Sequence, residues 1–481
     1  MRKSRKINTP ISAALLLISA VCLAQNEGLQ LPPIFASGMV MQQQDSVTIW
    51  GRGDINSNVV VAPGWEDTGS KTVTGSDGKW SLRVATPEAS FTPYEMVISS
   101  KRDTLVLRDI LIGDVWFISG QSNMYASFRG FINQPVYRAQ EILLQSNING
   151  IRLFKVKDGS SVVECDTIEG AWQYTKIENV IDFSAVGFVY GKTLYEYLNI
   201  PIGLVQCAQS GSKAEAWLDI ESLREFGRVD LDDIVVREGL GTSRPTLQYN
   251  KMLKPLLPMR IKGVIWYQGE ANVREYEVYR DLFPFLITRW REYFDNVDLP
   301  FYYVQIAPFS YDFVPGLESQ YLREVQLETM KKLDHVGMAV TLDLGSREKI
   351  HPPEKELVGK RLAYWALNRT YGIESLACRG PELRSMEVDG NVAKLKFDHS
   401  PGGLSTFGRE LTGFKVAGND RNFHEAKAVI ETETGSVGVV LVWSDEVRNP
   451  VAVRYGFTNY IKGSLFNVQG LPASSFRTDD W

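Results

Sequence analysis

The chain has 481 residues, of which 44% are hydrophobic and 23% are charged. This composition is typical of globular proteins and excludes a disordered, collagen-like or coiled-coil chain, while the length predicts roughly two to four domains. The formal net charge of −5 gives no reason to expect nucleic acid or another polyanion as a partner. Only four histidines are present, so a hydrolase with a histidine base would have few candidates.

Residues 1–24 are typical of a secretory signal peptide, because four cations precede an apolar run that ends at Ala24, a small residue suited to cleavage. The run is shorter than the roughly 20 residues that a membrane-spanning helix needs, and no later segment is apolar enough to span a bilayer. We therefore expect a periplasmic or secreted protein. Lipidation of Cys22 is an alternative, but Val21 stands where lipoprotein signals usually have a small residue.

The other cysteines are Cys165, Cys207 and Cys378. They can form at most one disulfide, and their spacing matches no zinc site. We therefore expect no metal and no other cofactor, and a fold that rests on apolar cores.

Three domains are expected after the signal peptide. Short alternating strands with turn residues between them predict a β-sandwich over 25–110 and a second one over 376–481. Over 111–375, apolar strands alternate with amphipathic segments, which predicts an α/β domain with a parallel sheet and helices on both faces.

The expected elements of the α/β domain follow one another in a regular order. Buried strands are predicted at 115–119, 202–208, 263–268, 301–307 and 338–344, and helices near 136–146, 185–198, 277–295, 318–333 and 354–369. In such sheets reactive residues collect at the carboxyl ends of the strands. The most polar, glycine-containing strand ends follow Ser119, Ala208 and Tyr267.

The first of these strand ends carries a candidate nucleophile. Ser122, in Ser119-Gly120-Gln121-Ser122-Asn123-Met124, follows its strand directly. A serine on a strand-to-helix turn is exposed at the sheet edge, close to helix amides that can stabilise an anion. A helix-capping serine is the structural alternative.

Four blocks of sequence, in order along the chain, resemble the sialate O-acetylesterase family, a branch of the SGNH hydrolases. They are Gly120 to Met124 after Asp114-Val115-Trp116, Ser212 to Leu218, Trp266 to Asn272, and Ile350-His351-Pro352 followed by Lys355, Gly359 and Arg361-Leu362-Ala363. The resemblance implies an SGNH-hydrolase-like esterase domain with Ser122 as nucleophile and His351 as its base. The other histidines agree with this, because His399 and His424 fall in the C-terminal β region and His335 ends a predicted helix.

The third member of a catalytic triad is where the chain departs from the family. Many SGNH enzymes have an aspartate three residues before the histidine, where this chain has Glu348. Glu348 is our candidate for orienting the His351 imidazole. Asp343, at the end of the preceding predicted strand, is a second candidate. A Ser–His dyad oriented by a backbone carbonyl is the third possibility.

An esterase also needs preorganised donors for the oxyanion. The Ser122 amide is one candidate and the Gly211 amide a second, although the family more often has Trp-Gly-Gly where this chain has Gln-Ser-Gly. The side chains of Gln268 and Asn272 are candidates for a third donor or for substrate hydroxyls. Glu270 is expected to fix this loop.

We expect an exported carbohydrate O-acetylesterase that works through an acetyl-serine intermediate, with an O-acetylated sugar as its partner. Sialic acid is the family's namesake substrate, and acetylated xylan or another plant glycan is the alternative. The alternative to an enzyme is a non-catalytic glycan-binding protein. The sequence gives no indication of oligomeric state. Trp217 and Tyr267 are candidates for stacking on a sugar ring, whereas Trp116 and Trp266 are expected in the core.

Overall fold

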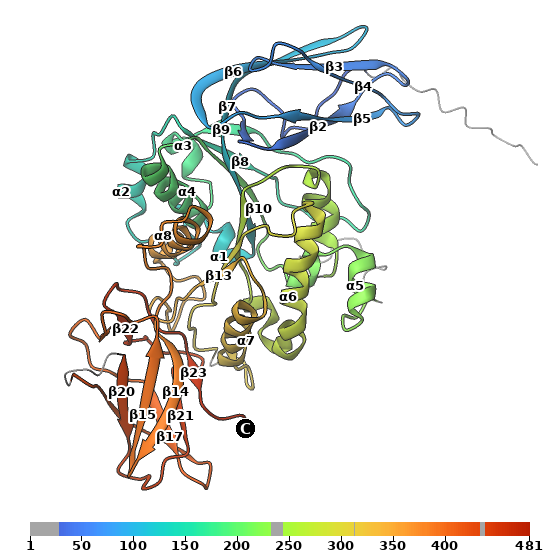
Figure 1. Ribbon diagram of the computed structural model, residues 1–481. Helices are drawn as coiled ribbons and strands as arrows, with labels where there is room; N and C mark the ends of the chain where they lie inside the picture. Colours follow the sequence, from blue (N-terminus) through green and yellow to red (C-terminus); the bar gives the residue numbers. More distant parts are fainter. Residues whose placement is uncertain (1–27, 232–243, 312, 433–437) are drawn as a thin grey trace, which may run out of the picture.

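The computed structural model describes residues 28–231, 244–311, 313–432 and 438–481, so the predicted signal peptide lies outside the described residues. Figure 1 shows β structure at the top and bottom of the molecule and an α/β body between them. The predicted α/β fold with additional β structure on both sides is thereby confirmed. Among the described residues no helix is long and apolar enough to cross a membrane.

The N-terminal part consists of short strands, of which those at 46–52 and 58–63 are buried at every second residue. Its strands are β1 (Val40–Gln42), β2 (Ser46–Arg52), β3 (Asn58–Pro63), β4 (Ser70–Val73), β5 (Lys79–Ala85) and β6 (Ser90–Ser99). β2 pairs with β5 in one sheet, and β3 pairs with β4 and β6 in another. This alternation buries one face of each sheet, as a sandwich requires.

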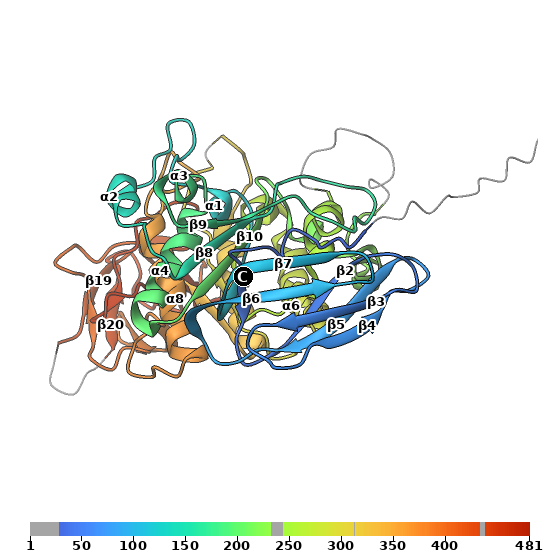
Figure 2. The ribbon, with the colours of Figure 1, turned by 90° about the horizontal axis from the view of Figure 1, so that it is seen from above.

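One long strand joins the N-terminal part to the central body. β7 (Thr104–Gly120) pairs with β6 in its first half and with β10 and β11 in its second half. The predicted domain boundary between residues 110 and 111 therefore falls inside a continuous strand, which passes from the upper strands into the body (Figures 1 and 2).

The central sheet has the order β13-β12-β11-β7-β10-β8-β9. Its members besides β7 are β8 (Ile151–Lys155), β9 (Trp172–Tyr174), β10 (Ile202–Ala208), β11 (Gly263–Tyr267), β12 (Phe301–Val304) and β13 (Val336–Ala339). All pairs are parallel except that of the edge strand β9. The five predicted strands are present, and β8 and β9 are additional.

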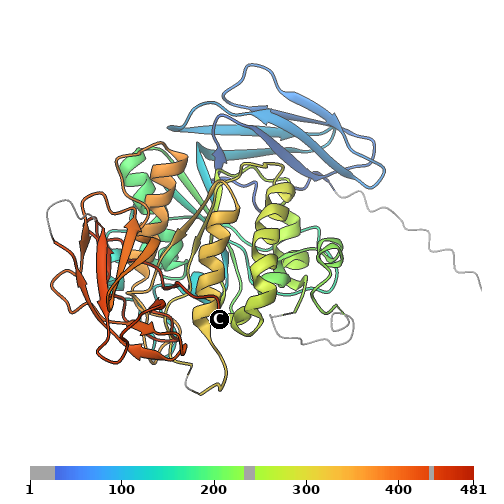
Figure 3. The same ribbon diagram turned by 60° about the horizontal axis from the view of Figure 1, so that its bottom comes forward.

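Helices cover both faces of this sheet. They are α1 (Ser122–Tyr125), α2 (Ala139–Leu144), α3 (Ile177–Val180), α4 (Ala185–Leu198), α5 (Ile220–Phe226), α6 (Tyr276–Tyr293), α7 (Ser319–Lys332) and α8 (Lys355–Trp365). Figure 3 shows α6 and α7 side by side on one face of the sheet. The other face is covered by α4 and α8, which pack against each other.

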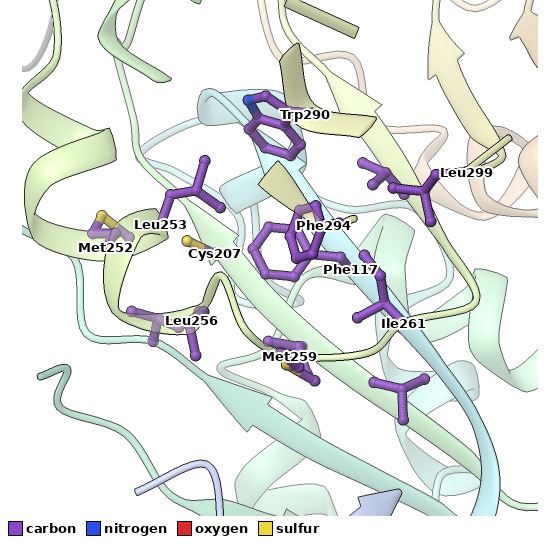
Figure 4. Close-up of a cluster of buried hydrophobic side chains, with 14 of the residues drawn as sticks. Phe117, Cys207, Met252, Leu253, Leu256, Met259, Ile261, Trp290, Phe294 and Leu299 are labelled. Carbon is purple, nitrogen blue, oxygen red and sulfur yellow. The ribbon is translucent and has the colours of Figure 1, made fainter. Parts of the chain in front are cut away.

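Successive residues of β7 point into two separate cores. Phe117 faces Trp290 and Phe294 of the α6 region, in the cluster that Figure 4 shows, together with Cys207 from β10. Trp116 lies in the opposite core, where α4 and α8 pack. A strand buried on both faces needs apolar residues at every position, which is why this segment reads as a continuous apolar run.

The three described cysteines, Cys165, Cys207 and Cys378, are free. Cys207 is completely buried, and burial raises the pKa of its thiol far above the ordinary value. The single disulfide that the cysteine count permits is thus not formed among the described residues.

The C-terminal part contains two four-stranded antiparallel sheets, with orders β14-β15-β20-β19 and β18-β17-β21-β23, and a short pair β16-β22. Its strands are β14 (Glu382–Asp389), β15 (Val392–Asp398), β16 (Leu404–Ser405), β17 (Phe414–Ala417), β18 (Phe423–Glu425), β19 (Lys427–Ile430), β20 (Val439–Trp443), β21 (Ala452–Tyr455), β22 (Phe466–Asn467) and β23 (Phe476–Arg477). The inner faces share one apolar core.

A buried arginine on α7 holds the C-terminal part against the body. The Arg323 guanidinium is completely buried and donates to the carbonyl oxygens of Gly456 (3.3 Å) and Thr458 and to Ser475 Oγ (3.3 Å). Burial lowers the pKa of this side chain to about 10, so it remains a cation at neutral pH.

We predict that Arg323→Met destabilises the protein, because it removes the hydrogen bonds by which a completely buried guanidinium holds Gly456, Thr458 and Ser475 of the C-terminal part. The expected loss in the free energy of unfolding is about 2–3 kcal/mol, measured by chemical denaturation. The control is Arg224→Met, which removes an exposed arginine whose one ion pair among the described residues is with the exposed Glu221, and it should cost less than about 0.5 kcal/mol. Equal losses in the two variants would contradict the role of Arg323.

Candidate active site

The register of the central sheet brings three of the four motif blocks together. Gly120, at the end of β7, lies opposite Ala208 of β10 on one side and Tyr267 of β11 on the other. The chain first builds β8 and β10 to one side of β7 and then β11, β12 and β13 to the other. Ser122 therefore stands at the point where the order of strands reverses, which is where α/β sheets usually place their binding crevice.

Gly120 makes this close approach possible. It has φ +134°, and a Cβ atom there would lie 2.2 Å from the carbonyl oxygen of Tyr267. The neighbouring Gln121 amide donates to the same oxygen at 2.9 Å. The turn before Ser122 is thus bonded to the end of β11, and only glycine fits at position 120.

Buried amide side chains then join the loops that follow the strands. Gln121 Oε1 accepts hydrogen bonds from the backbone amides of Gly269 (3.2 Å) and Ala271 (3.1 Å). These bonds link the first block to the third.

Gln268 and Asn272 link the third block to the second. Gln268 Nε2 donates to Ser212 O (3.3 Å) and to Asn272 Oδ1 (2.6 Å), while Asn272 Nδ2 donates to Glu215 Oε2 (2.9 Å). Both side chains are buried, and both hydrogens of Gln268 Nε2 have acceptors within the protein. In this structure the two amides hold the Gly211–Glu215 loop in place, and the two hydrogens of Gln268 Nε2 are not free for a ligand.

Two backbone amides do lie at the sheet edge. Ser122 is the first residue of α1, where helix amides have no partner within the helix, and Gly211 is exposed with φ +75°. Among the described residues neither amide donates a hydrogen bond. Both are therefore available to an anion, as expected for an oxyanion hole.

The loop after β13 carries His351 back to Ser122. Asn123 Nδ2 donates to the carbonyl oxygen of Ile350 at 3.1 Å, so the residues next to Ser122 and His351 are directly bonded. The described hydrogen bonds include none between Ser122 and His351 themselves, and catalytic hydrogen bonds often form only when substrate is bound.

The His351 imidazole is oriented by Gln134, a residue that the sequence did not indicate. Gln134 Oε1 lies 3.0 Å from His351 Nδ1 and also accepts the His351 backbone amide at 3.3 Å. An amide oxygen can only accept, so Nδ1 carries the proton and Nε2 has the free lone pair that a base needs. The Phe131 ring packs against the imidazole with 4.4 Å between ring centres.

The structure does not bring the predicted acids to His351. The Glu348 side chain is exposed and forms no hydrogen bond or ion pair with any described residue. Both Asp343 oxygens bind Arg361, each at 2.7 Å. The expected orienting position is thus occupied by the Gln134 amide oxygen, which comes from a loop far away in the sequence.

The surroundings of His351 hold its pKa at about 4, first because the ring is partly buried and second because the Lys355 ammonium is near. Lys355 is itself buried, and burial lowers its pKa to about 7 while Glu270 opposes the shift. Burial raises the pKa of Glu270. Glu270 accepts from Asn123 Nδ2 at 2.6 Å, which joins the third block to the residue after Ser122.

The tryptophans and the tyrosine near the motif blocks do not form an exposed platform. Trp116, Trp217, Trp266 and Tyr267 are all completely buried, so the expected sugar stacking on Trp217 and Tyr267 is not possible here.

A cavity of about 720 Å³ lies elsewhere, between the N-terminal strands and the 165–167 and 254–258 segments, and the predicted site residues are not among its lining. The described residues contain no group of three or more His, Cys, Asp or Glu side chains that could hold a metal ion.

An α/β sheet with these motif blocks at the ends of adjacent strands is the arrangement of a carbohydrate esterase. Residues 112–368 match the family model described as carbohydrate esterase, sialic acid-specific acetylesterase. The chain belongs to this family, which confirms the resemblance carried by the four blocks.

Individual relatives agree with this family. The chain is 29% identical to human sialate O-acetylesterase over 395 residues, which cover 75% of each protein. It is 28% identical to the mouse sialate O-acetylesterase over 511 residues, which cover 93% of this chain and 92% of the relative. Among solved structures, a carbohydrate acetylesterase from Xanthomonas citri is 33% identical, has a TM-score of 0.83, and covers 94% of this chain and 100% of its own.

We predict that Gln134→Ala lowers kcat for an acetyl ester at least about tenfold, because the imidazole loses the partner that fixes its tautomer. Initial rates with an activated acetyl ester measure this. Glu348→Gln and the exposed Gln140→Ala on α2 serve as controls and should change kcat less than about twofold. A larger loss from Glu348→Gln than from Gln134→Ala would restore Glu348 as the orienting acid.

We also predict activity at unusually low pH. A base works only when unprotonated, and His351 with a pKa of about 4 stays unprotonated until the pH falls through that value. The acid limb of the kcat/KM profile should therefore have its midpoint near pH 4, well below the 6.5 of an ordinary histidine. Fluorescence at each pH checks that the protein remains folded. A midpoint near 6.5 would contradict the environment described for His351.

Proposed function

We propose that this protein is an exported serine carbohydrate O-acetylesterase that removes acetyl groups from sialic acids through an acetyl-serine intermediate. The observation that carries the proposal is the meeting of Ser122, the Gly211 amide and the His351 loop at the carboxyl edge of the sheet. The family match over 112–368 supports the acetyl ester of a sugar as substrate class.

In the proposed reaction Ser122 Oγ attacks the acetyl carbonyl carbon and its proton passes to His351 Nε2. The amides of Ser122 and Gly211 stabilise the negative oxygen of the tetrahedral intermediate. The intermediate collapses as the sugar oxygen leaves and takes the proton from His351. A water molecule, deprotonated by His351, then attacks the acetyl-serine, and acetate leaves as Ser122 regains its proton.

A neutral partner for His351 suits this reaction at low pH. A carboxylate beside the imidazole would favour the protonated ring, whereas the Gln134 amide oxygen orients Nδ1–H without adding a negative charge. The ring therefore remains unprotonated until the pH falls to about 4.

Sialic acid is proposed as the sugar because the family model and the mammalian relatives are described by that substrate. Acetylated xylan or another plant glycan is the second candidate, because the Xanthomonas citri relative is described only as a carbohydrate acetylesterase. Acetate release from acetylated sialic acids and from acetylated xylo-oligosaccharides, compared at equal ester concentration, distinguishes the two.

Export follows from the predicted signal peptide at 1–24. Cell fractionation of the full chain tests it, with N-terminal sequencing of the mature protein to locate the cleavage site.

We predict that Ser122→Ala lowers the rate of acetate release at least about a thousandfold, because no nucleophile is left to form the acetyl-enzyme. The matched control is Ser119→Ala. Ser119 lies three residues earlier on β7, and its buried Oγ has no hydrogen-bond partner within the described part of the chain, so this change should preserve both activity and folding.

Two results would overturn the proposed function. Acetate release that survives in a folded Ser122→Ala protein rules out the acetyl-serine mechanism. Tight glycan binding by the unmodified protein, with no acetate released from any acetylated sugar, favours the non-catalytic glycan-binding protein instead.

A further inference from the structure

A tight turn between α1 and α2 lies directly against His351. Two backbone hydrogen bonds close it, from the Phe131 amide to Gln134 O (3.0 Å) and from the Gln134 amide to Phe131 O (2.9 Å). The residue at each end also contacts the imidazole: the ring centre of Phe131 lies 4.4 Å from that of His351, and Gln134 Oε1 lies 3.0 Å from Nδ1. Ile132 and Asn133 therefore form the tip of a turn that is fastened to the candidate base.

The chain on both sides of this turn is anchored as well. Before the turn, the Arg129 guanidinium donates to both carboxylate oxygens of Asp182, at 2.6 and 2.9 Å. After the turn, the Tyr137 amide donates to the carbonyl oxygen of Pro353 at 2.9 Å, two residues beyond His351. These bonds fix the position of the turn relative to the imidazole.

The tip of the turn is apolar and faces the solvent. Ile132 is 90% exposed, the largest exposed fraction among the large apolar side chains that the structure describes. A solitary exposed apolar side chain is common on protein surfaces and needs no explanation by itself. Ile132 differs because it follows a residue whose ring packs on the candidate base, and because its turn is held in place.

A sugar substrate requires apolar surface of this kind next to the reacting atoms. Small-molecule sites are lined mainly by apolar side chains with a few placed polar groups, and the C–H groups of a sugar ring can pack against such side chains. Within the motif blocks, the candidates Trp217 and Tyr267 are completely buried. An apolar contact for the sugar has to come from outside these blocks, and the turn at 131–134 offers one beside His351.

We propose that Ile132 is a specificity-determining residue of the esterase, whose side chain packs against the sugar that carries the acetyl group. This inference rests on the proposed function and concerns the substrate of that same site. The acetyl group lies at Ser122 and His351, and Ile132 contacts the alcohol part of the ester. Its effect therefore depends on how far the alcohol part extends from the reacting carbonyl group.

The test compares two acetyl esters with alcohol parts of different size. One is an acetylated sialic acid or an acetylated xylo-oligosaccharide, whichever releases acetate faster, and the other is ethyl acetate, whose alcohol part is too short to extend along the turn. Ile132→Ser should lower the ratio of kcat/KM for the sugar to kcat/KM for ethyl acetate by about five- to tenfold, because it removes partial burial of an aliphatic side chain. Most of the change should appear in KM for the sugar.

Two further variants serve as matched controls. Val297→Ser makes the same kind of change at a branched aliphatic residue that is 74% exposed and precedes β12, at the opposite edge of the sheet, so it should leave the ratio unchanged. Ile132→Leu retains an aliphatic side chain of the same size and should keep most of the ratio. Since both positions are exposed, these variants are expected to fold, and circular dichroism checks this.

Two results would overturn the role of Ile132. One is an unchanged ratio in the folded Ile132→Ser protein. The other is an equal loss with both esters, which would mean that the turn acts on His351 and not on the sugar.

Binding gives a second readout that needs no turnover. Calorimetry of the same acetylated sugar with the Ser122→Ala protein should show about five- to tenfold weaker binding when Ile132→Ser is added, and equal affinity contradicts the contact. The two proposals fail separately. A folded Ser122→Ala protein that still releases acetate overturns the proposed function, while the ratio measured on the Ile132→Ser protein still decides the role of Ile132. An inactive Ser122→Ala protein together with an unchanged ratio overturns only the role of Ile132.

Discussion

The close parallel packing of β7 between β10 and β11 is the constraint on which the site depends. Gly120 sits where a side chain would collide with the Tyr267 carbonyl group, and its backbone has a positive φ that glycine adopts easily. This contact sets where β7 ends relative to its neighbours. Because parallel strands in register end at one edge, the loops with Ser122, Gly211 and Gln268 must begin next to one another.

Buried polar groups hold those loops in a single arrangement. Gln121, Gln268 and Asn272 each bond to a neighbouring loop, so the amide-rich motif blocks serve mainly to connect the strand ends. A connected network of this kind restricts movement, which is what an oxyanion site requires of its donors. Among the described residues, the groups that remain for a ligand include the Ser122 and Gly211 amides, Ser122 Oγ and the imidazole.

The flanking β parts are attached to this body in two different ways. The N-terminal part shares the continuous strand β7, so it cannot rotate freely about a linker at residues 110–111. The C-terminal part is held by the buried Arg323, which is bonded to its carbonyl groups, and by the partly buried Arg477, which is bonded to Glu324 on α7 at 2.7 and 3.0 Å. Neither attachment supplies a side chain to the candidate site, since Ser122, Gly211 and His351 all come from the central body.

The sequence by itself determined the α/β class, the order of its strands and helices, and the family, because apolar runs and motif blocks are local features. β10 and α4 have the bounds that the apolar pattern predicts, and the two short strands β8 and β9 were missed because they are interrupted by polar residues. Ser122 and His351 could be named in the same way, and their catalytic roles remain predictions.

Only the tertiary structure decided what surrounds Ser122 and His351. Gln134 and His351 are 217 residues apart, and no local pattern reports a contact between loops so distant in the chain. The burial of Lys355 and the pairing of Asp343 with Arg361 likewise depend on how α8 packs, so the charge and orientation of the base follow from packing and not from the motif that contains it.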